Sequence, residues 1–433
     1  MMTGSLGGRT ILRYAHIFRH RCSGGAERYL ENLNRTLLER NDLTIVQMHL
    51  VQAADWAVPL EEQRCGIGRL IWVPVALRRV DRSLAGLVSR FRILAADGGY
   101  GAGRGPERHV LRVAWRLVMN RFGHLRYPFV VLSERLAGFL DSHRVDLLCL
   151  HWMSYDVGPI IRTALKARLP YVVINHFDND RLRAPKYRRW LAHASGIGGV
   201  SSLGVPAWLK ADFVNLGDAT NTQTFDPARA KPVERPPGAL VLLPARIIEG
   251  KGHLDLLQCA RLLLDRGREV SVAFAGLVDS QGLLEELHST IGALGLEGRV
   301  SFLGELREPE LRDWYAASDV VVLPSYSEGL SRVLLEAQAM EKPVVAYAIG
   351  GTPEALLSGR TGYLVRAGDL ESLAGRLDSL LLRPAEGTAM GRAGRAFVKD
   401  TFSTAGLTSR HERFYLDALQ SAGVNPHGKA GQR

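Results

Sequence analysis

Two glutamates bracket the predicted start of a helix in the segment VVVLPSYSEGLSRVLLEAQAMEKPVVAYAIGG. Glu328 lies in the loop after an apolar strand, and Glu336 follows seven intervening residues later, about two turns into the helix. The free amides and positive dipole end of a helix N-terminus favour anions, so the backbone near residues 330–332 is a candidate seat for a phosphate. Glu328 would then reach the group attached to that phosphate, and Glu336 would accept hydrogen bonds from ribose hydroxyls. The alternative is a first-turn acid that complements the dipole and an ordinary surface glutamate.

Two basic side chains follow the end of another predicted strand, in the segment LLPARIIEGKGH. Arg246 and Lys251 lie in the turn after residues 239–244. Breaking a sugar–diphosphate bond leaves negative charge on the phosphates, and fixed arginine and lysine donors can stabilise that charge without a metal. Taken alone, the pair could be two solvated loop cations. Together with Glu328, it predicts a site for a diphosphate-linked group.

Histidines and glycines mark strand ends in the first half of the chain. His176 follows the predicted strand YVVIN, His151 ends VDLLCLH, and His16 lies just after the first strand. Each is either a ligand contact or a structural histidine. Gly24 and Gly25 open a predicted helix, where glycine serves either a close backbone approach to a ligand or a tight turn. Their spacing lacks the G-x-G-x-x-G of a dinucleotide site, which argues against NAD.

Apolar runs of strand length alternate with amphipathic helical stretches in both halves of the chain, a pattern typical of parallel sheets covered by helices. Ligands of such sheets bind beyond the carboxyl ends of the strands. We therefore expect an α/β protein with two Rossmann-like domains and a ligand site between them. The expected strands are residues 10–14, 43–48, 147–150, 171–175 and 197–200 in the first half, and 239–244, 270–276, 300–304, 320–324 and 343–348 in the second.

The predicted boundaries divide the 433 residues into five segments. Residues 1–215 form an N-terminal Rossmann-like domain, the polar, proline-rich stretch 216–238 is a linker, and residues 239–400 form a C-terminal Rossmann-like domain. Residues 401–421 form a terminal helix that packs back toward the N-terminal domain, and residues 422–433 form a disordered tail.

The composition is that of a soluble globular protein, with 46% hydrophobic and 23% charged residues. No segment reaches the roughly 18 uncharged apolar residues that a membrane span needs, and the N-terminus has no apolar signal region, so we expect a cytoplasmic protein. Four cysteines, Cys22, Cys65, Cys149 and Cys259, have no metal-ligand spacing and are expected to be reduced.

The net charge of +11 is concentrated in one arginine-rich segment, residues 78–126. Within it, Arg108, Arg112 and Arg116 recur every fourth residue and would form one helical stripe. This stripe is either a contact with anionic lipid headgroups at the inner face of the cytoplasmic membrane or a solvated helix face. Nucleic acid is not expected as a partner, because the segment lacks interleaved aromatic residues.

The sequence resembles the family 4 retaining glycosyltransferases, which have the GT-B fold. The resemblance is strong from about residue 240 to 365 and weaker before it. It implies metal-independent transfer of a hexose-type sugar from a nucleotide-diphosphate-sugar, with retention of the anomeric configuration and no cofactor. It also implies that residues 239–400 bind the donor, that residues 1–215 bind a glycan or lipid-linked acceptor, and that the domains close around the donor. The motifs that carry the resemblance are Arg246, Lys251 and Gly252, the FLGEL turn at 302–306, the Glu328 and Glu336 pair, and the GGTPEAL stretch at 350–356.

The resemblance assigns roles to individual residues. Arg246 and Lys251 would bind the donor diphosphate. Glu328 would bind the donor sugar, Glu336 the ribose, and His176 the donor sugar near the reacting centre. The remaining donor-binding residues would be Gly24, Gly25, Gly329, Leu330, Ser331, Gly350 and Gly351.

The sequence departs from the family pattern at three places. Leu330 and Ser331 replace the usual aromatic residue and glycine, which bears on the fit around the donor sugar. Glu341 stands where a glycine often precedes the K-P-V strand. Leu-Gly-Asp at residues 216–218 replaces a Pro-Asn-Gly linker, which bears on the hinge between the domains.

Two further alternatives remain open at this stage. Asp178, Asn179 and Asp180 spell the D-x-D of metal-dependent transferases, but such triplets are common in loops and Arg246 and Lys251 already supply the countercharge, so no metal is predicted. The rival functions are a GT-B-fold epimerase or hydrolase that acts on nucleotide sugars, and a non-catalytic nucleotide-sugar-binding protein.

Overall fold

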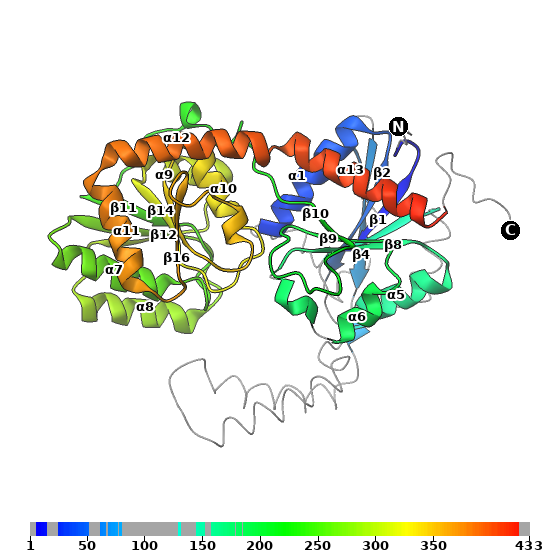
Figure 1. Ribbon diagram of the computed structural model, residues 1–433, viewed down its shortest axis with the longest axis horizontal. Helices are drawn as coiled ribbons and strands as arrows, with labels where there is room; N and C mark the ends of the chain where they lie inside the picture. The colour runs from blue at the N-terminus through cyan, green and yellow to red at the C-terminus, as the bar shows by residue number, and fades with distance from the viewer. Residues whose placement is uncertain are drawn as a thin grey trace, which may run out of the picture.

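The computed structural model describes residues 6–14, 25–51, 61–65, 68–76, 78–79, 129–130, 144–151, 157–177, 179–183 and 185–423. These residues form two α/β domains that lie side by side along the long axis of the molecule (Figure 1). No helix within these ranges is long and apolar enough to cross a membrane. The arginine-rich segment lies outside the described residues, apart from the short strand β5 (Arg78–Arg79), which pairs with β6 (Phe129–Val130).

In the described part of the chain, the first domain contains an eight-stranded sheet with the order β10-β9-β8-β7-β1-β2-β4-β3. Its strands run parallel except β3, which is antiparallel to β4. Buried leucine, isoleucine and valine side chains fill both faces of the central strands, as parallel sheets require. The strands are β1 (Thr10–Tyr14), β2 (Thr44–Val51), β3 (Glu61–Cys65), β4 (Gly68–Ala76), β7 (Leu147–His151), β8 (Tyr171–Asn175), β9 (Gly196–Gly199) and β10 (Phe213–Asn215).

The second domain is built on a parallel sheet whose six described strands have the order β13-β12-β11-β14-β15-β16. The order reverses direction at β11, the point at which ligands of open α/β sheets bind. The strands are β11 (Ala239–Leu243), β12 (Val270–Ala275), β13 (Val300–Gly304), β14 (Val320–Leu323), β15 (Val344–Tyr347) and β16 (Gly362–Val365).

Helices cover both faces of the second sheet. One layer contains α7, α8 and α11, which pack on one another, and the other contains α10 and α12, which also pack together, with α9 beside them (Figure 1). The helices are α7 (His253–Asp265), α8 (Gln281–Leu294), α9 (Glu308–Ala317), α10 (Arg332–Ala339), α11 (Leu370–Leu382) and α12 (Pro384–Thr401), and the first domain has α1 (Gly25–Arg40), α5 (Val157–Lys166) and α6 (Pro185–Leu191).

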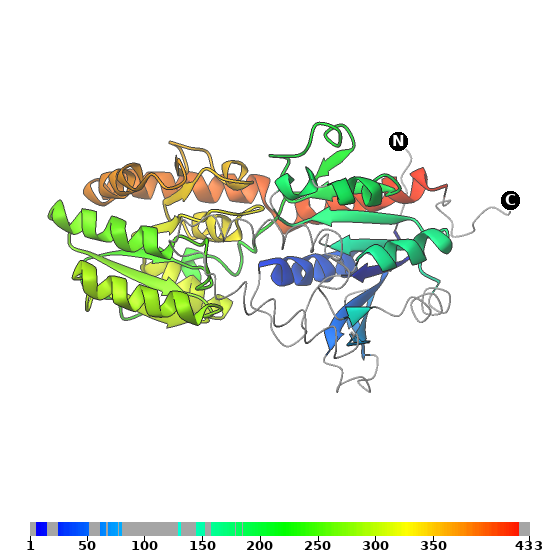
Figure 2. The same ribbon diagram turned by 90° about the horizontal axis from the view of Figure 1, so that it is seen from below.

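The last helix, α13 (Thr404–Ser421), returns to the first domain. It continues the line of α12 and lies over the first domain in both views (Figure 1; Figure 2). It packs against α1, β8 and β9. Hydrogen bonds join Tyr29 of α1 to His411 of α13 at 2.8 Å, and Arg13 of β1 to Tyr415 of α13 at 3.0 Å. The chain therefore crosses between the domains twice, once before β11 and once after α12.

The predicted fold class is confirmed, since both halves contain parallel sheets covered by helices. All ten predicted strands are present, within a few residues of the expected bounds. The sequence analysis missed β3, β4, β5, β6, β10 and β16. In β4, Pro74 interrupts the apolar run, and a proline usually argues against a strand inside a sheet.

Candidate active site

Most of the predicted site residues lie in loops that follow three adjacent strands of the second sheet. The loop after β11 carries Arg246 and Lys251, the loop after β14 carries Glu328, and the loop after β15 carries Gly350 and Gly351. Since β11, β14 and β15 are parallel neighbours, their carboxyl ends bring these loops to the same edge of the sheet.

Backbone contacts hold the β11 loop against the β14 loop. The carbonyl of Gly250 accepts hydrogen bonds from the Tyr326 amide at 2.8 Å and from the Ser325 hydroxyl at 3.2 Å. Gly252 has a φ of 75°, and a Cβ at this position would lie 2.0 Å from the carbonyl oxygen of Pro324. Glycine is therefore required here, both by the left-handed backbone and by the close approach.

Lys251 and Glu328 form an ion pair across these two loops. Lys251 Nζ lies 2.6 Å from Glu328 Oε1, and the side chains are 23% and 15% exposed. Charge-assisted hydrogen bonds of this length, between partly dehydrated groups, hold both side chains in fixed positions. An ammonium has three donors, so Lys251 can bind a phosphate oxygen while it keeps Glu328 as a partner.

Arg246 has a different partner. Its guanidinium lies 2.6 Å from Asp279 Oδ2, in the loop between β12 and α8, and its side chain is 49% exposed. Arg246 and the Lys251–Glu328 pair thus share the carboxyl edge of the sheet, but their ion pairs are separate. The contact with Asp279 uses Arg246 Nη1, and a guanidinium has five N–H donors, so Arg246 can bind a phosphate oxygen while it keeps Asp279 as a partner.

The N-terminus of α10 follows directly after Glu328. Ser331 is the N-cap residue, and its side chain caps no backbone amide. The side chains of Leu330 and Ser331 are buried. The side chains of Leu330 and Ser331 are therefore not accessible to a ligand, and a contact with the backbone amides of this turn stays a prediction.

Three predicted donor-binding glycines are positions of close backbone approach. A Cβ at Gly350 would lie 2.0 Å from the carbonyl oxygen of Glu328, and one at Gly351 would lie 2.0 Å from that of Gly329. A Cβ at Gly329 would lie 2.3 Å from the carbonyl oxygen of His176 in the first domain. The β15 loop thus packs on the β14 loop, and the β14 loop packs on the first domain. These close approaches fix the backbone conformation around Glu328.

Glu336 differs most from its predicted position. Its side chain has no exposed surface, Oε2 accepts a hydrogen bond from the Tyr315 hydroxyl at 3.1 Å, and Oε1 lies 3.6 Å from Arg332 Nε. Arg332 in turn lies 3.4 Å from Asp218 in the segment between the domains. The carboxylate therefore orders the start of α10 from inside the domain. A ribose would reach it only after Tyr315 or Arg332 moved, so the ribose contact stays a prediction.

The two predicted histidines lie together at the carboxyl ends of β7 and β8. His151 Nδ1 is 2.8 Å from His176 Nε2, and the His176 ring meets the Tyr29 ring edge-on at a centroid distance of 4.7 Å. Burial lowers the pKa of His176 to about 3. Burial also lowers the pKa of His151 well below its usual value, with further lowering from His176 and Arg13. Both rings are therefore neutral at physiological pH.

Glu354 links the two domains and was not singled out from the sequence. It belongs to the 3-10 helix η5 (Thr352–Glu354). Its Oε1 accepts hydrogen bonds from the amide and hydroxyl of Ser202 at 3.0 and 2.6 Å, and its Oε2 accepts one from Asn215 Nδ2 at 3.2 Å. In the sequence, Glu354 is the acidic residue of the GGTPEAL stretch at 350–356.

A second group missed in the sequence braces the same loops. Asp255, in the first turn of α7, accepts hydrogen bonds from the Tyr326 hydroxyl at 2.7 Å and the Tyr347 hydroxyl at 2.5 Å. The two tyrosine rings meet edge-on at 5.4 Å. Tyr326 stays 49% exposed and leaves an aromatic ring at the surface two residues before Glu328.

Some predicted residues fall outside the described part of the chain. Gly24, His16 and Asp178 are among them, whereas Gly25 is described as the first residue of α1. Within the described ranges, no three His, Cys, Asp or Glu side chains gather as a metal-ligand set. Cys149 and Cys259 are free thiols and buried.

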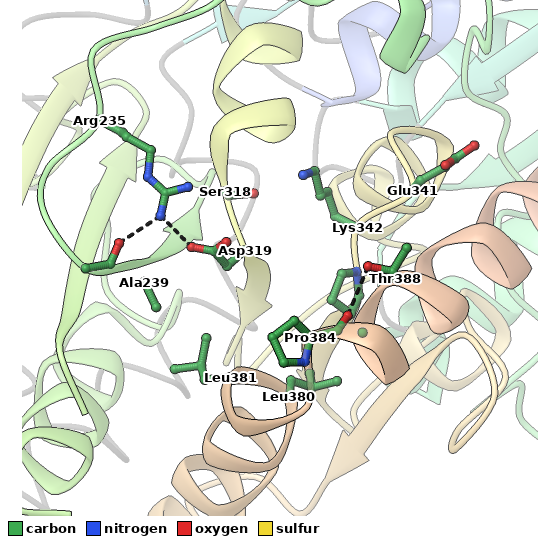
Figure 3. A pocket seen from close by; sticks show the side chains of 13 residues that line it. Arg235, Ala239, Ser318, Asp319, Glu341, Lys342, Leu380, Leu381, Pro384 and Thr388 are labelled. Carbon is green, nitrogen blue, oxygen red and sulfur yellow. Dashed lines mark hydrogen bonds and ion pairs between the residues drawn. The ribbon is translucent and has the colours of Figure 1, made fainter. Parts of the chain in front are cut away.

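A cavity of about 420 Å³ lies at the opposite, amino edge of the second sheet (Figure 3). Its wall includes the starts of β11 and β15 and parts of α11 and α12. Arg235 bonds to Asp319 at 2.7 Å, and Lys342 donates to the carbonyl of Ala316 at 2.7 Å. Arg235 and Lys342 are thus already bound to protein atoms. None of the predicted site residues lines the cavity.

A family model described as "Glycosyl transferases group 1" matches residues 224–397. Curated relatives also match part of the chain. The D-inositol 3-phosphate glycosyltransferase of Arthrobacter sp. (strain FB24) is 38% identical over 174 residues, which are 40% of this chain and 41% of that protein. The protein of the same name from Corynebacterium aurimucosum is 30% identical over 219 residues, 48% of this chain and 52% of that protein. The chain thus spans about half or less of the length of these relatives.

Solved structures match over nearly the whole chain. Sucrose-phosphate synthase from Thermosynechococcus elongatus has a TM-score of 0.67 at 16% identity and covers 95% of this chain and 100% of that one. Anabaena HepE in complex with UDP and glucose has a TM-score of 0.66 at 17% identity and covers 94% and 99%. At these identities the likeness concerns the fold. The chain therefore has the GT-B fold, and within it residues 224–397 are similar to the glycosyltransferases of group 1.

Proposed function

We propose that this protein is a retaining glycosyltransferase of family 4, which transfers a hexose from a nucleotide-diphosphate-sugar to a glycan or lipid-linked acceptor without a metal. One observation carries the proposal. The Lys251–Glu328 ion pair lies at the carboxyl edge of the second sheet, inside the range that matches the group 1 glycosyltransferases. A cation and a carboxylate held 2.6 Å apart suit a ligand with an anionic phosphate next to a hydroxyl-rich sugar.

The donor in this proposal is bound mainly by the second domain. Structures of HepE contain UDP, or UDP-glucose, which supports a nucleoside-diphosphate donor here. Lys251 and Arg246 would bind the diphosphate, and Arg246 would use guanidinium donors other than the Nη1 that contacts Asp279. Glu328 would bind hydroxyls of the hexose. Glu336 would accept from the ribose if it exchanged its present contact with Tyr315.

Chemically, the acceptor hydroxyl attacks the anomeric carbon from the face that the diphosphate leaves. The bond between that carbon and the phosphate oxygen breaks, the new glycosidic bond forms, and the departing phosphate oxygen takes the acceptor proton. Lys251 and Arg246 stabilise the charge that develops on the leaving diphosphate, so their contribution is largest in the transition state. No side chain has to act as a base.

The acceptor is proposed to bind the first domain, opposite the donor loops. His176 lies at the carboxyl edge of that sheet, is partly exposed and is neutral, which suits contact with sugar hydroxyls, while the fully buried His151 supports it from behind. We further propose that the arginine-rich segment, residues 78–126, attaches the protein peripherally to anionic lipid. Sedimentation with vesicles, with and without an anionic lipid, tests this part on its own.

The test of the main proposal combines binding and turnover. Each of a set of UDP- and GDP-sugars is added to the purified protein, and the matching donor is expected to raise the melting temperature, since a ligand of the native state stabilises it by about 2.7 kcal/mol at 100 times its Kd. That donor is then supplied with glycan and lipid-linked acceptors, and the anomeric configuration of the product is determined by NMR. An inverted product would overturn the retaining mechanism, conversion of the donor to its epimer would indicate an isomerase, and binding without any turnover would indicate a sensor.

A further inference from the structure

Helix α6 and the chain that joins β9 to β10 form a surface of the first domain that lies outside the candidate active site. The joining chain, residues 200–212, is held in place at its start, where the side-chain amide of Asn179 donates to the carbonyls of Ser201 and Leu203 at 2.8 Å each. Farther along, this chain and α6 contribute to one core cluster, through the buried Leu209 and Leu191. The surface outside that cluster is therefore built on fixed backbone.

The side chains that point away from the cluster are apolar and basic together. Leu203 and Trp208 are 38% and 39% exposed, although Leu209 beside them is buried. The guanidinium carbon of Arg188 lies 5.7 Å from the centre of the Trp208 ring, a cation–π contact between α6 and the joining chain. Arg189 and Lys210 are also exposed. The α6 surface is defined by these five residues, Arg188, Arg189, Leu203, Trp208 and Lys210.

The positive charge of the α6 surface is not balanced by acids of its own. Between residues 185 and 212, Asp212 is the only acidic residue of the sequence. Arg188, Arg189 and Lys210 form no ion pair within the part of the chain that the structure describes. Arginines elsewhere on the protein do pair with acids, as in Arg266–Glu371 at 2.7 Å. An anionic partner would therefore find three cations that need not leave an acid first.

We propose that the α6 surface binds an anionic lipid bilayer, with Trp208 at the level of the headgroups. Tryptophan has an apolar ring and a polar N–H, and arginine and lysine have apolar stems below their charges, so these residues suit the boundary between water and lipid. The three cations are spread over a helix and a loop and do not converge on one point. Such a spread fits a surface with many negative charges better than a single small anion.

The α6 surface is continuous with the contact between the domains. Ser202, near the start of the joining chain, donates to Glu354 of the second domain at 2.6 Å, and Trp208 follows six residues later. Binding to a bilayer would thus bring the interface between the domains close to the lipid headgroups. The consequence for the acceptor rests on the proposed function: a transferase held in this way takes a lipid-linked acceptor and not a soluble glycan.

The first test is sedimentation of the full chain with phosphatidylcholine vesicles, with and without phosphatidylglycerol. The variant Arg188→Glu/Arg189→Glu should bind the anionic vesicles about 10²-fold more weakly, because each basic residue near such a membrane contributes about fivefold and both charges are reversed. Residues 78–126 are unchanged in this variant, so their own attraction to lipid cannot produce the difference. Unchanged binding of the folded variant overturns the inference.

A matched variant in the second domain controls for net charge. Arg376→Glu/Arg392→Glu changes the charge by the same amount at two exposed arginines, and Arg376 also lies over an aromatic ring, that of Tyr363, at 4.7 Å. This control should alter binding by less than about threefold at 0.15 M salt, where charges act over about 8 Å. Equal losses in the two double variants would mean that net charge alone matters, which also overturns the inference.

The second test locates Trp208 itself and does not depend on the double variants. Anionic vesicles with brominated acyl chains quench tryptophans that reach the bilayer, and Trp208→Phe isolates the contribution of Trp208 among the seven tryptophans. Quenching should be smaller in Trp208→Phe than in the wild type. Equal quenching in the two proteins overturns the inference. So does an emission change of Trp208 with soluble oligosaccharides but not with vesicles, which would identify a glycan-binding surface.

These measurements need no donor and no sugar transfer. A protein that transfers no sugar but shows the quenching of Trp208 retains this inference and loses the proposed function. An active transferase whose Trp208 is not quenched retains the proposed function and loses this inference. If both hold, Arg188→Glu/Arg189→Glu should slow transfer to an acceptor embedded in anionic vesicles and leave slow hydrolysis of the donor unchanged.

Discussion

The two sheets present different chemistry at the edges that face each other. At the second sheet, the loops carry charged side chains in two ion pairs, Lys251–Glu328 and Arg246–Asp279. At the first sheet, His151 and His176 are neutral and joined by a hydrogen bond. Under the proposed function, charged side chains lie where a diphosphate departs, and a neutral imidazole, His176, lies where sugar hydroxyls would bind.

Solvent access explains why each edge keeps its own chemistry. The charged groups of the second sheet are on loops, and both ion pairs keep some contact with water. The histidines of the first sheet lie under α1 and α13, where desolvation disfavours the imidazolium. The difference in charge between the two edges therefore comes from how many elements cover each edge. Substitutions in either domain can test it.

The largest effect is expected from removing the charges of the second sheet. Lys251→Ala and Glu328→Ala should each lower kcat of sugar transfer by about 10² to 10³, because each acts on charge or sugar contacts that strengthen in the transition state. The measurement is a steady-state assay with the donor found by thermal stabilisation.

A remote ion pair provides the control for these two variants. Arg266→Ala removes the pair between Arg266 and Glu371 at 2.7 Å, on α7 and α11. It should leave kcat unchanged, and circular dichroism should show all three variants folded. Equal rates for Lys251→Ala and Arg266→Ala would remove the ion pair from the mechanism.

The next largest effect concerns the glycine that joins the charged loops. Gly250 and Gly252 both have positive φ, 85° and 75°, but a Cβ at Gly250 meets nothing within 4 Å, whereas one at Gly252 meets the Pro324 carbonyl oxygen at 2.0 Å. Gly250→Ala should destabilise by about 1–2 kcal/mol through the left-handed backbone alone. Gly252→Ala should cost about 3 kcal/mol or more, since the β14 loop must also move.

Urea denaturation of the two alanine variants measures this difference. Gly252→Ala should also lower the rate of sugar transfer more than Gly250→Ala does, because a displaced β14 loop would move Glu328. If both variants lose the same stability, the close approach of Gly252 contributes nothing beyond its φ.

Acid should weaken the first domain before the second. His176 and His411 have pKa values lowered to about 3 by burial, and the pKa of His151 is also lowered, while the unfolded value is about 6.5. Below pH 6.5 the unfolded chain binds protons that the folded domain does not, so stability falls as the pH falls toward 3. Each histidine contributes up to about 1.4 kcal/mol per pH unit.

Hydrogen exchange at pH 7 and pH 5, corrected for the intrinsic rates, measures this loss for each domain. The second domain has His253, whose pKa burial lowers to about 4, and should lose less protection. His411→Phe should reduce by about one the number of protons that the first domain takes up on unfolding in acid. Equal acid sensitivity of the two domains would contradict the comparison.

The sequence predicted the two sheets well because their strands are short apolar runs between turn residues, and this signal is local. It also predicted that Lys251 and Glu328 lie at one edge, where the ends of neighbouring parallel strands meet, but not that they form an ion pair with each other. The depth of Glu336 could not be predicted, because its burial depends on Tyr315 of α9 and on the segment around Asp218. The hydrogen bond from Arg13 to Tyr415 could not be predicted either, since the two residues lie 402 positions apart.

Local backbone conformation bears on one departure from the pattern of the family that the sequence resembles. Glu341 has a φ of 57°, the left-handed region in which a glycine is favoured. A glycine at this position would therefore avoid the backbone strain that Glu341 has after α10. In segment 216–218, the middle residue Gly217 has a φ of 66°, and the buried Asp218 side chain lies 3.4 Å from Arg332.

The smallest effect is expected from Glu354, which joins the two edges. Glu354→Ala removes the hydrogen bonds to Ser202 and Asn215, but these contacts are exposed, so the stability of each domain should change by less than about 1 kcal/mol. What should change is the contact between domains. Small-angle X-ray scattering of the variant should give a larger radius of gyration than the wild type, and Glu371→Ala, which removes an ion pair inside the second domain, should give no change. If the scattering of Glu354→Ala matches the wild type, then the packing of Gly329 on His176 and of α13 on α1 is sufficient to hold the charged and neutral edges together.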